Sequence, residues 1–206
     1  ARDYLQQADR FWVGHQYTDV QLVFMHSDSV YRGDTPTSAV KLQVGMYAAR
    51  HDVESHTEFV RQLDGDWWLP AFLRYVDTQP SLAAGLQYVP APWNASLSLE
   101  VFEPPSGVHL ASTVDDFVDA NERFVGNLGL DYDDTGTPLL LGSRCDVLFW
   151  GHSNEQRVVD AMQTVRGSVE RIGEKYGVAS TVHTYMFVFT EMDAIVVEEA
   201  VQNMAL

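Results

Sequence analysis

The segment "RCDVLFWGHSNEQRVVDAMQTVRGSVERIGEKYGVASTVHTYMFVFT", residues 144–190, determines which fold we expect. Apolar residues occupy every second position at 144–152 and again at 181–190, a spacing typical of β-strands. Between them, residues 153–176 carry apolar side chains at helical spacing, and Gly177 is suited to end that helix. Two strands joined by a helix of this length predict a βαβ crossover.

Three further stretches show the same alternation and predict strands. They are "TDVQLVFMH" (residues 18–26), "SAVKLQVGMYA" (38–48) and "ASLSLEVF" (95–102). The turn-rich residues between the first two predict a hairpin with a long loop. In the third strand, Leu97, Leu99 and Val101 form an apolar face that we expect in the core.

Two more helices are predicted ahead of the crossover. Residues 113–128 carry apolar side chains at i, i+3, i+4 and i+7, and Ser112 or Thr113 is suited to be the N-cap. A weaker apolar stripe predicts a helix through Trp68, Leu69, Phe72, Leu73 and Val76.

The order of these elements predicts the fold class. Proline- and glycine-rich residues predict loops at 78–92 and 103–108, and we expect one domain over residues 1–206 with an internal joint at 78–94. The second half reads β-α-β-α-β, with the hairpin ahead of it. We therefore predict an α/β (α+β) fold. It has a mixed or antiparallel sheet of about five strands and helices mainly on one face, as in a ferredoxin-like or two-layer sandwich.

The composition limits the partners of the chain. Its 29 acidic and 13 basic residues give a formal net charge of −16, which opposes attraction to nucleic acid and to anionic membranes. No apolar run reaches the roughly 18 residues of a membrane span, and the first residues do not resemble a secretion signal, so we expect a soluble chain. The single Cys145 lies among apolar residues and is expected to be buried.

Residues 51–56, "HDVESH", concentrate metal-binding side-chain types. In a helix His51 and Glu54 lie about one turn apart while His56 points elsewhere, and an extended strand separates His51 from the others. Neither conformation gathers the whole set, which argues against a metal site and against metal-assisted hydrolysis there. The S-x-x-E pattern at 55–58, ahead of an apolar run, predicts a helix start.

Residues 131–142, "DYDDTGTPLLLG", resemble the first half of a calcium-binding loop. Asp131, Asp133 and Thr135 occupy ligand positions, but Gly142 stands where the bidentate glutamate is required. We therefore predict an Asx-type turn before the strand at 144–152, and no metal site in the chain.

The crossover strands suggest a candidate binding surface. Each has one apolar face and one face that mixes aromatic residues with histidine. The mixed faces carry Trp150, His152, His183 and Tyr185, and Tyr47 and Glu100 are expected to join them from neighbouring strands. If the two crossover strands are adjacent, about 4.8 Å apart, these side chains lie within reach of one another. Either this surface binds a ligand or partner, or another part of the chain covers it.

Aromatic walls with a few polar groups are typical of small-molecule pockets, so we predict a substrate-binding domain or subunit of an enzyme. Over residues 95–192 the element order is similar to that of the substrate-covering cap domains of FAD-linked oxidases. That resemblance implies an oxidoreductase whose FAD lies in another domain. It rests on no motif, so no residue role is transferred and no catalytic residue is assigned. The alternative is a non-enzymatic module that binds another protein chain through the aromatic face.

Overall fold

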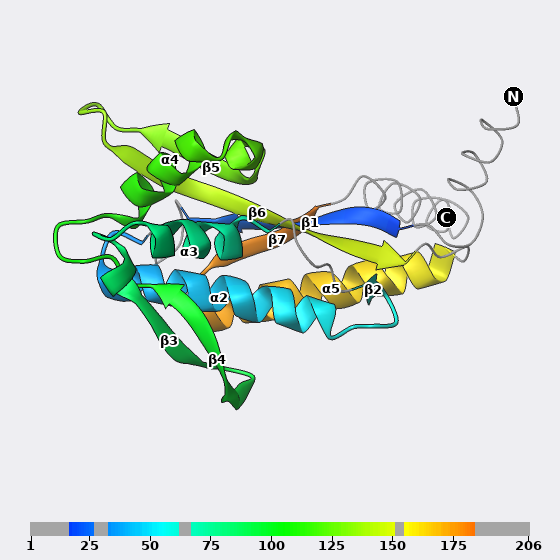
Figure 1. The fold of residues 1–206 in the computed structure, drawn as a ribbon. Helices are drawn as coiled ribbons and strands as arrows, with labels where there is room; N and C mark the ends of the chain where they lie inside the picture. Colours follow the sequence, from blue (N-terminus) through cyan, green and yellow to red (C-terminus); the bar gives the residue numbers. More distant parts are fainter. Residues whose placement is uncertain (1–16, 27–32, 62–66, 151–154, 184–206) are drawn as a thin grey trace, which may run out of the picture.

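The computed structural model describes residues 17–26, 33–61, 67–150 and 155–183 (Figure 1). The strands are β1 (Tyr17–Met25), β2 (Val60–Arg61), β3 (Leu86–Ala91), β4 (Asn94–Phe102), β5 (Leu128–Tyr132), β6 (Pro138–Trp150) and β7 (Ala179–His183). The helices are α2 (Pro36–Glu54), α3 (Trp68–Thr78), α4 (Leu110–Ala120) and α5 (Glu155–Tyr176), with short 3₁₀ helices η1 (Ala83–Gly85) and η2 (Glu122–Asn127).

The main sheet has five antiparallel strands. Its order is β2-β6-β1-β7, and β5 pairs with β6 on the same side as β2. Since β1 runs antiparallel to both neighbours, β6 and β7 are parallel, with β1 between them and α5 connecting them. The order β5-β6-β1-β7, with α2 and α5 in contact with each other, is the split βαβ arrangement of ferredoxin-like folds. The predicted fold class and crossover are confirmed.

The core lies between this sheet and the two long helices (Figure 1). Register pairs Val20 with Val147 and Leu22 with Cys145, and all four side chains are buried. The apolar faces of the predicted crossover strand and helix contribute to it, with Val147, Phe149, Val165, Val169 and Ile172 in the core. The predicted helical stop is also confirmed, because Gly177 has φ +67° directly after α5.

The prediction for the strand at 95–102 is only half right. The strand exists as β4, but it pairs with β3 in a separate two-stranded sheet. Val101 is buried outside the main core cluster, Leu99 is half-buried, and Leu97 is 51% exposed. The alternation identified a strand correctly, but it did not reveal that most of this strand lies away from the main sheet.

The prediction of a strand at 38–48, and of a hairpin with β1, is wrong. These residues belong to α2, whose N-cap Thr35 forms a capping box with Ser38 and whose first turn contains Pro36. Its buried residues include Ala39, Leu42, Met46, Ala49 and Val53, which follow the helical period. Leu42 and Met46 fit both a period of two and a period of 3.6, which is why the alternation misled.

The prediction of a helix start at Ser55 is also wrong, because α2 ends there. Ser55 is the C-cap, its N–H donates to the carbonyls of the last turn, and its hydroxyl donates to the Asp52 carbonyl. The helical pattern that begins at Pro36 therefore extends through "HDVE", and in the described residues up to Arg61 no helix follows the S-x-x-E match. Residues 62–66 lie outside the described residues.

The segment between β2 and β5 differs from the prediction in detail. The stripe at 68–76 is confirmed as α3, with its five apolar residues buried. The helix expected at 113–128 begins earlier, at Leu110, after a His109 N-cap without a side-chain bond, and it gives way to η2. The expected loop at 78–92 contains η1 and β3. No helix in the described ranges is long and apolar enough to cross a membrane.

Candidate functional site

The predicted aromatic face spans strands that are not neighbours. The assumption that they are adjacent is wrong, because β1 separates β6 from β7. The register still aligns Asp146 of β6 with His183 of β7 on one face, since both pair with Gln21 of β1. The Trp150 side chain, His152 and Tyr185 lie outside the described residues, so this binding surface stays a prediction.

Tyr47 and Glu100 do lie near each other, but not on that sheet. Tyr47 is in α2 and Glu100 is in β4. Burial, and then the nearby Glu100 carboxylate, raise the pKa of Tyr47 to about 12. The Tyr88 hydroxyl donates to Glu100 Oε1 at 3.3 Å, and the Tyr47 ring meets the edge of Trp67 at 4.7 Å. These side chains form a separate cluster between α2 and the hairpin.

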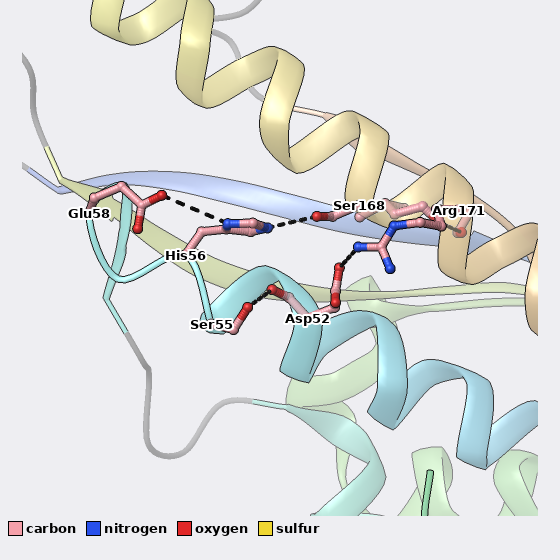
Figure 2. Close-up of polar contacts among 8 residues, drawn as sticks. Asp52, Ser55, His56, Glu58, Ser168 and Arg171 are labelled. Carbon is pink, nitrogen blue, oxygen red and sulfur yellow. Dashed lines mark hydrogen bonds and ion pairs between the residues drawn. The ribbon is translucent and has the colours of Figure 1, made fainter. Parts of the chain in front are cut away.

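The "HDVESH" side chains point to different partners (Figure 2). Arg171 of α5 donates to Asp52 at 2.6 Å, and His56 Nε2 lies 2.8 Å from Ser168 Oγ of the same helix. In the other direction, the His51 ring stacks on Trp93 at 4.3 Å. Within the described residues no three His, Cys, Asp or Glu side chains are grouped so that they could hold a metal ion.

Ser168, His56 and Glu58 have the order of a Ser-His-acid triad, and Figure 2 shows them in line. The geometry does not suit nucleophilic catalysis. Ser168 is only 4% exposed, in the middle of α5, where the backbone N–H groups are engaged in the helix and none remains for an oxyanion hole. His56 Nδ1 lies 3.8 Å from Glu58 Oε1, beyond hydrogen-bond distance. These contacts attach the end of α2 to α5.

The segment 131–142 contains the predicted Asx-type turn at residues 133–137, between β5 and β6. Asp133 accepts hydrogen bonds from the Thr135 hydroxyl, the Thr135 N–H and the Thr137 N–H at 2.6–2.9 Å. These bonds, with the Thr135 hydroxyl first, lower the pKa of Asp133. Gly136 has φ +79°, a conformation that favours glycine. The Asp133 carboxylate is therefore engaged in hydrogen bonds within the turn.

Two buried groups, Cys145 and His26, keep their uncharged forms at neutral pH. Burial raises the pKa of the Cys145 thiol to about 12, so it stays protonated, and the prediction of a buried cysteine is confirmed. Burial lowers the pKa of His26 to about 4, and its Nε2 lies 3.0 Å from Ser143 Oγ. At neutral pH His26 is therefore uncharged.

The structure contains a cleft that the sequence analysis did not predict. A hollow of about 560 Å³ lies between the start of α2, the base of the β3–β4 hairpin and residues 103–109. A smaller hollow of about 240 Å³ extends to the start of β6. Both are lined by Asp34 and His109, which therefore stand where the two hollows meet. The larger volume is in the range of small-molecule sites.

At two glycines, the chain segments that form the walls of this cleft pack closely against each other. Gly33 has φ +79°, and a Cβ there would lie 2.9 Å from Leu110 Cδ2, so the chain before α2 packs closely on the start of α4. That packing brings together the two segments that carry Asp34 and His109, which line the same hollows. At Gly85, a Cβ would lie 2.5 Å from the Glu103 carbonyl oxygen, because the chain before β3 approaches the end of β4 closely.

The lining of the larger hollow is mainly apolar, with a few polar and acidic side chains. It includes Asp34, Gln87, Glu103, Ser106 and His109, and the residues that line either hollow in the described parts of the chain include no lysine or arginine. Gln87 donates to Glu103 Oε2 at 2.5 Å. The N-terminal ends of α2 and α4 add roughly half a positive charge each, against two full carboxylate charges. The balance favours a cation over an anion.

Only part of this site could have been predicted from the sequence. Gly33, Thr35 and Pro36 together indicate a helix start, which would have placed Asp34 at a helix N-terminus. Nothing local connects Asp34 with His109 or with the hairpin. No protein-family model, curated protein or solved structure matches the chain, so these comparisons add no functional residue.

Proposed function

We propose that this chain is a small-molecule-binding domain whose site is the cleft at Asp34 and His109. The observation that supports this most is the hollow of about 560 Å³, where hydrogen-bonding groups from three parts of the chain converge. Asp34 comes from the residues before α2, Gln87 from β3, and His109 from the N-cap of α4. Such convergence provides several contacts to a ligand that one loop alone would not provide.

The ligand that fits this lining is a small organic cation, such as an amine. Two carboxylates line a cleft without a lysine or arginine in its described lining, and opposite charge attracts a cation to them. A carboxylate or phosphate ligand would add negative charge to a chain whose formal net charge is already −16. The His109 imidazole and the Ser106 hydroxyl supply hydrogen bonds that orient the ligand.

In its wider form, the proposal is that this chain is part of an enzyme and that the cleft is a substrate site. The oxidoreductase activity and the FAD in another domain stay predictions, as does binding of another protein through the aromatic sheet face. The cleft supports ligand binding independently of the aromatic sheet face, because none of the residues that line the cleft belongs to that face.

The proposal is tested with a panel of ligands that are matched in size and differ in charge. Amines, neutral alcohols and carboxylates with the same carbon skeleton are tested by thermal shift, and hits are titrated by calorimetry. We expect stabilisation by amines alone, because a ligand that binds only the folded state at about 100 times Kd adds roughly 2.7 kcal/mol. Asp34→Asn should weaken an amine at least tenfold, a loss of about 1.4 kcal/mol.

Asp119→Asn is the matched control, because Asp119 is exposed on α4 and does not line the cleft. It removes the same charge from the molecule and should leave amine affinity within about twofold. Preferred binding of carboxylates, or equal losses in the two variants, would contradict the proposed site.

A further inference from the structure

The smaller of the two hollows differs from the larger one in its lining. Gln87, Glu103 and Ser106 line the larger hollow and do not line the smaller one. Besides Asp34 and His109, which line both hollows, the smaller one is lined by Gly33, Ala111, Thr137, Pro138, Leu139, Leu140 and Leu141. It is therefore a mainly apolar pocket that adjoins the polar groups shared by the two hollows.

Two leucines of this pocket expose apolar surface. Leu139 and Leu141 of β6 are 38% and 37% exposed, whereas Leu140 between them is buried in the core. The register of β6 with β5 shifts here, since Gly129 pairs with Gly142 but Leu130 pairs with Leu140, which leaves Leu141 without a paired residue in β5. The exposed surface of the two leucines lines a hollow, where the hydrocarbon part of a ligand can cover it from water.

Polar groups on the β6 side of the pocket already have partners. The Thr137 N–H donates to the Asp133 carboxylate at 2.9 Å, and the Thr137 hydroxyl lies 2.9 Å from the Thr135 hydroxyl. The Leu141 carbonyl accepts a hydrogen bond from the His26 N–H at 2.7 Å. A polar ligand group placed against this wall would lose hydrogen bonds to water, whereas a hydrocarbon group would not.

The size and charge of the site determine which part of a ligand lies where. At about 240 Å³ the smaller hollow is below the range typical of a whole small-molecule ligand, so it suits one substituent. Asp34 is exposed, so water weakens its attraction to a cation. A ligand gains additional affinity when its cationic group lies at Asp34 and its hydrocarbon part covers Leu139 and Leu141.

We propose that the ligand of the cleft is an alkylamine, with its ammonium group at Asp34 and its hydrocarbon chain in the smaller hollow. This inference rests on the proposed function, because it uses the same cation site. It adds the chemical class of the ligand and the direction in which the ligand lies. A further polar group on the ligand would lie in the larger hollow, where Gln87 and Ser106 supply hydrogen bonds.

Calorimetric titration with the primary amines from methylamine to hexylamine tests the inference. We expect the affinity to rise about fourfold with each added methylene until the hollow is filled, because burial of one CH₂ contributes about 0.8 kcal/mol. The matched ligand is 5-amino-1-pentanol, which has a hydroxyl group in place of the terminal methyl group of hexylamine. It should bind roughly tenfold more weakly than hexylamine, because its hydroxyl group would lose hydrogen bonds to water.

Four variants separate the chain from the cationic group. Leu139→Ala removes apolar wall and should reduce the gain per methylene to about twofold, whereas Leu97→Ala is the control, because Leu97 is 51% exposed on β4 and lines neither hollow. Ala111→Leu fills the pocket and should end the gain at a shorter chain. Asp34→Asn should weaken all the amines by a similar factor and leave the gain per methylene unchanged.

The outcomes distinguish failure of this inference from failure of the proposed function. Amine binding that requires Asp34 but does not depend on chain length would overturn the inference and leave the proposed function intact. An equal gain per methylene in Leu139→Ala and in the wild type would show that the chain lies elsewhere, and would also overturn it. Absence of binding by every amine would contradict the proposed function, and the inference with it.

Discussion

The main sheet and the segment inserted between β2 and β5 are built differently. The sheet packs against α2 and α5 through largely aliphatic side chains, such as Val147 and Val169. The inserted segment, residues 67–127, has aromatic contacts instead, with Phe72 5.7 Å from both Phe102 and Phe117. The cleft involves the inserted segment through Gln87 and residues 103–109. The two regions share one hydrophobic core, and the inserted segment in addition supplies most of the cleft lining.

The largest expected effect is a charge in the aliphatic core. Val169→Asp places a carboxylate at a fully buried position of α5, and we expect a loss of more than about 4 kcal/mol, enough to unfold the domain. Gln163→Asp, at an exposed position of the same helix, is the control and should remain folded. Circular dichroism during thermal unfolding measures both. A Val169→Asp variant as heat-stable as the wild type would show that the sheet and α5 do not form the stabilising core.

The buried His26 should make the stability of the sheet depend on pH. Its pKa is lowered from 6.5 to about 4 in the folded state, so below pH 6.5 the unfolded chain binds a proton that the folded chain does not. Stability contributed by neutral His26 is therefore present above pH 6.5 and decreases toward pH 4, by about 3 kcal/mol in total. Urea unfolding of wild type and His26→Gln at pH 7 and pH 5 measures this. Equal pH dependence in the two proteins would contradict it.

Gly85→Ala should disturb the inserted segment while the sheet stays intact. The new Cβ would lie 2.5 Å from the Glu103 carbonyl oxygen and 2.8 Å from Phe102 Cε2, so we expect a loss of roughly 1–3 kcal/mol and weaker amine binding. Gly167→Ala is the opposite control. No atom lies within 4 Å of its Cβ on α5, and it should stabilise by about 0.5–1 kcal/mol. Chemical denaturation distinguishes the expected loss of stability in Gly85→Ala from the expected gain in Gly167→Ala.

The smallest effect is expected for the ion pair between the helices. Arg171 and Asp52 are 2.6 Å apart, but their side chains are 62% and 25% exposed, so water screens the pair. A double-mutant cycle with Arg171→Gln and Asp52→Asn should give a coupling of about 0.2–1 kcal/mol. A coupling well above that range would mean that polar contacts, and not apolar burial, hold α2 to α5.

In the sheet region the sequence located β1, β6 and α5, for a physical reason. In β1 and β6 one face is buried along the strand, so period-two alternation is a reliable signal, and α5 has a clear stripe with Gly177 at its end. Leu42 and Met46 satisfied two periods at once, so α2 was misassigned. The cleft depends on Gly33 against Leu110 and Gly85 against Glu103, contacts that no local pattern encodes.

The most direct test of the account is to map amine binding by amide chemical shifts of the labelled wild-type chain. Binding at the cleft should shift the amides of Asp34 and of residues 106–109, with weaker changes at Gln87, since these line the larger hollow. The amides of β7, on the main sheet, should not move. Saturable shifts confined to residues 179–183, with none at Asp34 or His109, would contradict the assignment of the binding site to the cleft.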